Sequence, residues 1–130
     1  MNIFNPQTAT MIEARLYFGR NINGDPAISK SNFRAFCADS VTPHFFGFTY
    51  LDGVGSWEGA LEQCFILSIL MEDNANNRRQ CETIAEQYCD RFNQEAVAVQ
   101  FLPCQYAFVS SPAARAHKRS QEFRANGSQG

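Results

Sequence analysis

Residues 63–92, QCFILSILMEDNANNRRQCETIAEQYCDRF, contain the pattern that decides the fold. The first part, residues 63–71, is apolar on both faces and predicts a buried strand. Asp73 or Asn74 then caps a helix whose apolar positions keep the helical repeat. Those positions are Cys81, Ile84, Ala85, Tyr88, Cys89 and Phe92. The stretch therefore predicts a strand followed by an amphipathic helix that ends at Asn93.

The segment before this stretch begins with an amphipathic strand. In residues 12–20 (IEARLYFGR), apolar side chains alternate with Arg15 and Tyr17, as the two-residue repeat of a strand requires. Residues 21–26 (NINGDP) contain Asn-Gly and Asp-Pro pairs, which are typical of loops. This first strand is therefore expected to end at Arg20 and to lead into a loop.

A helix and a second strand are expected next. Ser29 is a good N-cap, and the apolar residues after it keep helical spacing. They are Phe33, Phe36, Cys37 and Val41. Pro43 ends the helix because the residue before a proline is pushed out of the helical region. Residues 47–51 (GFTYL) predict a strand and residues 52–55 (DGVG) a turn, whereas residues 56–59 continue the strand or open the return.

The last strand completes a known order of elements. Residues 96–102 alternate, Pro103 predicts a bulge or an edge position, and residues 104–109 resume extended structure. The order β-α-β-β-α-β is that of the ferredoxin-like fold. We therefore predict an α+β sandwich over residues 12–109, with a four-stranded antiparallel sheet and two helices on one face. A polar leader (residues 1–11) and a basic, mobile tail (residues 110–130) flank it.

The sheet face without helices is expected to need a cover. Large apolar patches are rare on monomers. If the third strand faces that way, this sheet face would display alternate residues of the strands, such as Arg15, Tyr17, Cys64, Ile66, Ser68 and Leu70. A second subunit, the tail or a ligand could cover this face, and we predict a homodimer packed sheet to sheet. The 12 Phe residues among 130 also favour a second buried surface.

Three short motifs add a resemblance to a known family. They are Tyr17-Phe18-Gly19-Arg20, Val41-Thr42-Pro43 and Leu51-Asp52-Gly53-Val54-Gly55-Ser56-Trp57. Over residues 13–109 the chain resembles a family of uncharacterised small bacterial proteins, a domain of unknown function with these motifs in its first strand, helix end and hairpin. The resemblance implies the same ferredoxin-like fold and assigns no chemistry. The leader and the tail depart from it, as in a specialised member from a phage or another mobile element.

Composition and cysteine spacing exclude several classes of protein. The longest apolar run, residues 64–71, is far shorter than the roughly 20 residues that a bilayer requires. The first ten residues lack the basic and apolar regions of a secretory signal. The five cysteines form no Cys-x-x-Cys pair, which excludes zinc ribbons and thioredoxin motifs. We expect a cytoplasmic protein with reduced thiols, no metal and no cofactor.

The net charge of -2 combines an acidic body with a basic tail. Residues 1–109 contain seven Lys/Arg and twelve Asp/Glu, a net charge of -5, whereas residues 110–130 contain four Lys/Arg and one Asp/Glu, a net charge of +3. Because phosphate contacts dominate affinity for nucleic acid, the acidic body argues against this class of partner. The tail could contact an acidic partner or the body itself.

The candidate site combines the first strand with the hairpin after the second strand. Arg20 could hold a carboxylate or phosphate, Trp57 could stack on a flat ring, and Asp52 could orient a hydroxyl or hold Arg20. Tyr17 and Arg15 complete the predicted ligand-binding residues. The alternative is an internal Arg20–Asp52 pair that fixes the hairpin, with Trp57 in the core.

No catalytic signature accompanies these residues. The sequence favours a non-catalytic module that binds an anionic or nucleotide-like molecule, such as a phage counter-defence protein that sequesters a host signalling nucleotide. One alternative is an inhibitor that binds a host protein complex through its acidic body. Another is a cofactor-independent enzyme of the tautomerase or oxygenase type, by analogy of fold. Its acid–base candidates would be Tyr17, Asp52 or His44.

Overall fold

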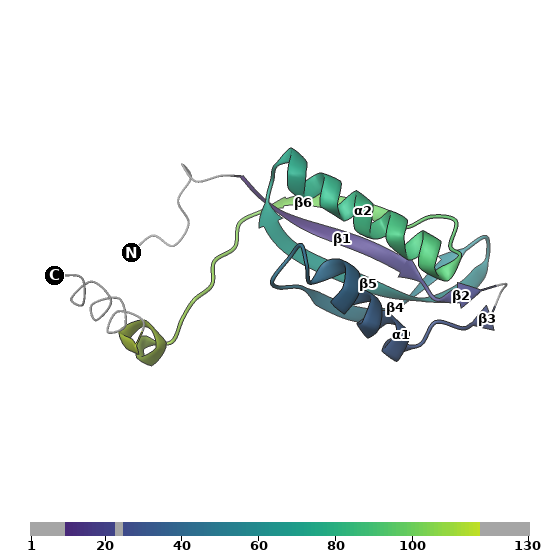
Figure 1. Cartoon of the computed structure of the whole chain (residues 1–130), viewed down its shortest axis with the longest axis horizontal. Helices are drawn as coiled ribbons and strands as arrows, with labels where there is room; N and C mark the ends of the chain where they lie inside the picture. Colours follow the sequence, from purple (N-terminus) through teal and green to yellow (C-terminus); the bar gives the residue numbers. More distant parts are fainter. Residues whose placement is uncertain (1–9, 23–24, 118–130) are drawn as a thin grey trace.

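Strand β1 (Met11–Gly19) lies inside a four-stranded antiparallel sheet. The computed structural model describes residues 10–22 and 25–117, and Figure 1 shows both helices on one side of the sheet. The other long strands are β4 (Thr49–Trp57), β5 (Ala60–Glu72) and β6 (Ala98–Cys104). Their order is β4-β5-β1-β6, so that the first and third long strands are central neighbours. This order confirms the predicted ferredoxin-like arrangement.

Helix α1 (Lys30–Phe36) begins where the sequence predicts. The Ser29 hydroxyl accepts a hydrogen bond from the backbone N–H of Asn32 and caps the helix. The chain continues as a π-helical segment, η1 (Cys37–Val41), which ends just before Pro43. The four predicted apolar positions are all buried in the core, at Phe33, Phe36, Cys37 and Val41.

Helix α2 (Ala75–Phe92) also keeps its predicted ends. The Asn74 side chain accepts a hydrogen bond from the backbone N–H of Asn77. Asn93 adopts a left-handed conformation with φ 53 and stops the helix. The apolar stripe of the helix is buried against the sheet at Cys81, Ile84, Ala85 and Tyr88.

The turn between β4 and β5 differs from the sequence prediction. The turn predicted at residues 52–55 is wrong, because these residues lie within β4 and the chain turns at Glu58 and Gly59, which both have positive φ. Gly53 has a different role, since a Cβ at this position would lie 3.1 Å from the Cys64 Sγ on β5. At Gly53 the missing side chain permits close packing between strands.

Two connecting segments differ from the prediction as well. The expected loop at residues 21–26 contains a short antiparallel pair, β2 (Asn21–Ile22) and β3 (Asp25–Pro26). Extended structure was expected over residues 104–109, but β6 ends at Cys104. Pro103 lies in β6 at the edge of the sheet, as predicted, where the missing N–H of a proline is tolerated.

The core between the helices and the sheet is rich in aromatic rings. Phe33 of α1 stacks on Phe65 of β5 with ring centres 4.2 Å apart, and Phe18 of β1 contacts Tyr88 of α2 at 4.5 Å. The aromatic side chains thus gather on the helix side, and the high Phe content needs no second buried surface. Burial raises the pKa of Cys37 to about 12, which keeps this core thiol protonated.

The ends of the chain are described only in part. Residues 1–9 of the predicted leader and residues 118–130 of the predicted tail lie outside the described residues, and residues 112–117 are helical. Among the helices that the structure describes, none has the length and apolar character needed to cross a membrane.

Candidate functional site

The sheet face that the helices leave free, called the open face below, carries a row of polar side chains on β1. Glu13, Arg15 and Tyr17 alternate along the strand with residues that are buried under the helices. The register places Leu70 of β5 and Leu102 of β6 opposite Glu13 on either side. A carboxylate therefore lies between two leucines on the open face.

Glu13 is held by two donors. Arg15 donates from Nε and Nη2 to the two carboxylate oxygens, at 3.1 and 3.0 Å, and the Ser68 hydroxyl donates to one of them at 2.6 Å. The hydrogen bond from Arg15, followed by that from Ser68, lowers the pKa of Glu13. Glu13 is therefore ionised at neutral pH, and its oxygens keep lone pairs for a further donor.

Tyr17 extends this row toward the end of β1. Its hydroxyl donates a hydrogen bond to Gln100 Oε1 of β6 at 2.9 Å. Its cross-strand neighbours are Ile66 on β5 and Ala98 on β6. The open face thus offers a flat aromatic ring next to an aliphatic side chain, which suits a planar ligand group.

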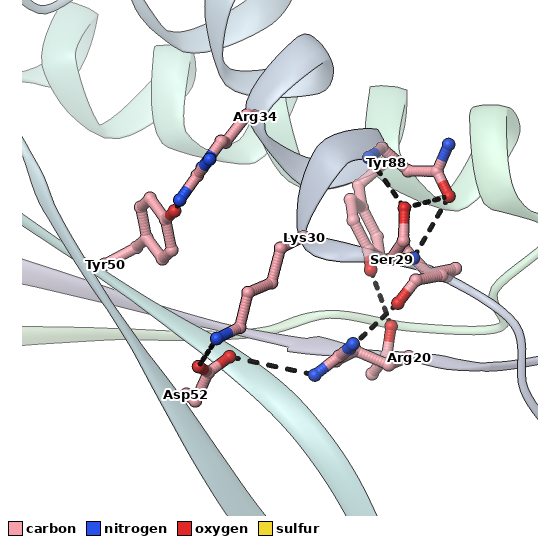
Figure 2. Close-up of polar contacts among 10 residues, drawn as sticks. Arg20, Ser29, Lys30, Arg34, Tyr50, Asp52 and Tyr88 are labelled. Atoms are coloured by element: carbon pink, nitrogen blue, oxygen red, sulfur yellow. Dashed lines mark hydrogen bonds and ion pairs between the residues drawn. The ribbon is translucent and has the colours of Figure 1, made fainter.

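Arg20 lies on the helix side, between β1 and α1 (Figure 2). Its Nε donates to the Ile28 carbonyl at 2.9 Å, and its guanidinium carbon lies 4.4 Å from the centre of the Phe65 ring. Asp52 pairs with Arg20 Nη1 at 3.7 Å and with Lys30 Nζ at 3.1 Å. Since the Arg20 side chain is only 15% exposed, its guanidinium is engaged by groups of the protein itself.

Two hydrogen bonds in Figure 2 fix the elements around Arg20. The Tyr88 hydroxyl of α2 donates to the Gly19 carbonyl at the end of β1, at 2.6 Å. Arg34 Nε of α1 donates to the Tyr50 hydroxyl of β4 at 2.9 Å. Burial raises the pKa of Tyr88, so its phenol stays protonated and remains a donor.

Trp57 lies at the end of β4, directly before the turn. Its side chain is 69% exposed, and its register partner is Ala60. The alternative that places Trp57 in the core is therefore wrong. The ring remains accessible from solvent for a ligand or for another protein surface.

The structure brings some of the predicted site residues together and separates others. Arg20 and Asp52 are in contact on the helix side, whereas Arg15 and Tyr17 share the open face. The sheet lies between these two pairs, and Trp57 lies at the hairpin turn. Within one chain, these five residues therefore do not converge on one pocket.

Sequence reasoning missed two members of the open-face row, Glu13 and Gln100. Glu13 could have been found, since the two-residue repeat places it on the same face as Arg15 and Tyr17. Ser68 was expected on this face, but its contact with Glu13, like the position of Gln100 opposite Arg15, depends on the register of β5 and β6. Lys30 was missed for the same reason, since its contact with Asp52 joins two distant elements.

His44, an acid–base candidate for the enzymatic alternative, is exposed in the segment after η1. The other two candidates, Tyr17 and Asp52, lie on opposite faces of the sheet. In the ranges 10–22 and 25–117, no three His, Cys, Asp or Glu side chains gather in a way that could hold a metal ion.

Among solved structures, the fold is similar to that of a phage SAM lyase. The structure of that lyase in complex with S-methyl-5'-thioadenosine aligns with a TM-score of 0.57 and 15% identity, over 84% of this chain and 97% of that chain. Its apo state aligns with a TM-score of 0.53 and 12% identity, over 82% of this chain and 100% of that chain. At such identities the similarity shows a common fold.

Sequence comparison identifies the family. No curated protein matches the chain. The model of one family, DUF3574, described as a protein of unknown function, matches residues 13–108. This range agrees with the resemblance that the sequence motifs indicated for residues 13–109. Because the match covers most of the chain, this protein belongs to the DUF3574 family.

Proposed function

We propose that this protein binds a nucleotide-like small molecule on the open face of its sheet, without transforming it. The observation that carries the proposal is the Glu13–Arg15–Ser68 cluster, in which a half-buried carboxylate is oriented by a guanidinium and a hydroxyl. Polar groups on a largely apolar surface are the usual composition of a small-molecule site. The open face combines such groups with Leu70, Leu102 and other aliphatic side chains of the sheet.

The chemistry of these side chains matches the parts of a nucleoside derivative. The Glu13 carboxylate accepts hydrogen bonds from hydroxyl or amino groups such as those of a ribose or a base. Arg15 supplies a cation for an anionic group of the ligand. The ring of Tyr17 supplies a stacking surface for a planar base.

The fold comparison supports this ligand class. The phage SAM lyase that shares the fold has a structure in complex with S-methyl-5'-thioadenosine, which is a nucleoside derivative. We propose that this chain takes a related molecule and sequesters it, as a phage counter-defence protein would. Adenosine derivatives with a thioether or a sulfonium group are therefore the first ligands to test.

The Arg20–Asp52 pair has a different role in this proposal. Because the guanidinium is held by Ile28, Phe65 and Asp52, it has few free donors for a ligand. We propose that the pair fixes β4 and α1 relative to the end of β1, and that Lys30 strengthens it. This assignment favours the structural alternative for Arg20 and Asp52.

Calorimetry tests the proposed site directly. The protein is titrated with S-methyl-5'-thioadenosine, SAM, adenosine and ATP, and at least one is expected to bind. Glu13→Gln and Arg15→Ala should weaken binding about tenfold or more, because each removes a charged hydrogen-bonding group. Arg34→Ala is the matched control, since this arginine is exposed on the helix side and pairs with Tyr50.

Two results would contradict the proposal. Absence of binding to every nucleoside in the panel would overturn the ligand class. Binding that is weakened by Arg20→Ala or Trp57→Ala but not by Arg15→Ala would move the site to the helix side or to the hairpin turn.

A second candidate function is a lyase reaction on SAM, favoured by the fold shared with the phage enzyme. The same titration samples distinguish the two functions. After incubation, liquid chromatography should recover SAM unchanged if the protein only binds it. Loss of SAM that depends on Glu13 or Tyr17 would replace the binding proposal with the catalytic one.

A further inference from the structure

The hairpin formed by β4 and β5 exposes apolar side chains on both of its faces. β1 pairs with β5 only as far as Cys64, so that the end of the hairpin extends past β1. Trp57 is exposed on one face of this end and Leu61, at 77%, on the other, where Val54 is exposed as well. The apolar tip of the hairpin therefore lacks the cover that the helices give to the rest of the sheet.

A second exposed apolar segment follows β6. Residues 105–117, called the arm below, run away from the sheet and end in a helical turn (Figure 1). Phe108 is 86% exposed and Val109 is 74% exposed. The Tyr106 ring contacts the Phe108 ring, with centres 5.7 Å apart. The arm thus presents a small aromatic and aliphatic surface to solvent.

The arm of one chain cannot reach the tip of its own hairpin. Met11 pairs with both Glu72 and Cys104, so the arm leaves the sheet beside the last residue of β5. The hairpin turn lies at the opposite end of β5, directly before its first residue, Ala60. The 13 residues of β5 span about 40 Å. Residues 105–109 span at most about 17 Å when fully extended. Only another chain can bring the two apolar surfaces together.

The charges of the two segments are complementary. Residues 49–63 contain Asp52, Glu58 and Glu62 and no Lys or Arg, whereas residues 110–130 carry a net charge of +3. Asp52 is paired with Arg20 and Lys30, but Glu58 and Glu62 form no ion pair within the described part of the chain. Within the described residues, the hairpin therefore has two unpaired carboxylates that a cation such as Arg115 of another copy can approach.

The edge of the sheet provides a further attachment. β4 is an outer strand, so that the backbone groups on its outer side are unpaired within the sheet. An extended segment can add to such an edge through main-chain hydrogen bonds. Residues 105–111 have no regular structure and are therefore suited to this pairing.

We propose that the protein associates with itself, with the arm of one copy packed on the β4–β5 hairpin of a second copy. Phe108 and Val109 cover the tip around Trp57 and Leu61, and Arg115 of the arm faces Glu58 and Glu62. The contact is reciprocal in a closed dimer and sequential in a ring. This inference does not depend on the proposed ligand, since it uses neither Glu13 nor Arg15.

Sedimentation velocity over a range of concentrations of the full chain tests this contact. The wild-type protein is expected to sediment as an oligomer. Phe108→Ser and Trp57→Ser should each weaken self-association at least about tenfold, because both remove large apolar side chains from the contact. Phe46→Ser is the matched control, since Phe46 is fully exposed but lies outside both segments. Circular dichroism checks that every variant is folded.

Charge reversal gives an independent measurement. Glu58→Lys together with Glu62→Lys should weaken the oligomer, and added salt should weaken the wild-type oligomer. A wild-type protein that stays monomeric at high concentration would overturn the proposal. So would an oligomer that resists Phe108→Ser and Trp57→Ser but dissociates with Leu70→Ser, since this result would indicate a homodimer packed through the open face. None of these outcomes depends on nucleotide binding.

Discussion

At the scale of single residues, the Glu13 carboxylate joins the polar side chains of the open face. Glu13, Arg15 and Tyr17 lie in one row along β1. Arg15 and Ser68 both donate hydrogen bonds to Glu13. The Glu13 carboxylate is oriented by Ser68, which lies 55 positions away in the sequence. Local patterns carry no information about such a distance.

Glu13 is expected to make the stability of the protein depend on pH. Hydrogen bonds from Arg15 and Ser68 lower the pKa of Glu13 in the folded state from its ordinary value of 4.5. Its contribution to stability is therefore complete above pH 4.5 and is lost as pH falls through the lower folded pKa. Glu13→Gln should lower the free energy of unfolding by about 1 kcal/mol at pH 7, and by less at pH 3. Urea unfolding at the two pH values measures this difference.

The control for this prediction is Glu86→Gln, which alters an exposed carboxylate of α2. Its effect on stability should be small at both pH values. If Glu13→Gln lowered the free energy of unfolding equally at pH 7 and pH 3, the ionised form of the carboxylate would contribute nothing to folding stability.

At the scale of elements, the helices were easier to predict than the hairpin. Ser29, Asn74 and Asn93 mark helix ends through local chemistry, and the structure confirms all three. The turn of the hairpin was predicted at residues 52–55 because Gly53 and Gly55 are residue types that are common in turns. Gly53 instead lies within β4, where the Cys64 side chain on β5 leaves little room for a Cβ. A local pattern cannot distinguish these two uses of glycine.

The cap of α2 gives a prediction at this scale. Asn74→Ala should destabilise the protein by about 1 kcal/mol, because the backbone N–H of Asn77 loses its acceptor at the helix start. Thermal or urea unfolding measures the change. Asn76→Ala, at an exposed position in the first turn, is the matched control and should be neutral or slightly stabilising. Equal effects of the two substitutions would contradict the capping role.

At the scale of the whole molecule, one aromatic core joins the helices to the sheet. Phe33 of α1 contacts the rings of Phe65, Tyr50 and Phe18, which come from three different strands. The sequence indicated an excess of aromatic residues and suggested a second buried surface. The structure shows that these rings pack together on the helix side, so the excess strengthens a single core.

This core predicts a large effect for one substitution. Phe33→Ala should destabilise the protein by about 3–5 kcal/mol, since it removes a fully buried ring and leaves a cavity beside Phe65. Phe46→Ala, at an exposed position, should change stability little. Urea unfolding of both variants measures the difference. A loss below about 1 kcal/mol for Phe33→Ala would show that the site collapses around the missing ring.

Local sequence patterns were enough to predict the order of the long elements, the buried face of the first strand and the helix caps, because these depend on neighbours within a few residues. Tertiary packing sets the sheet register, which places Ser68 and Gln100 beside Arg15, and it also brings Lys30 of α1 to Asp52 of β4. It also moved the turn to Glu58 and Gly59, and placed the apolar tip and the arm at opposite ends of β5. Register depends on packing and hydrogen bonds between residues far apart in the chain, and no local pattern encodes these contacts.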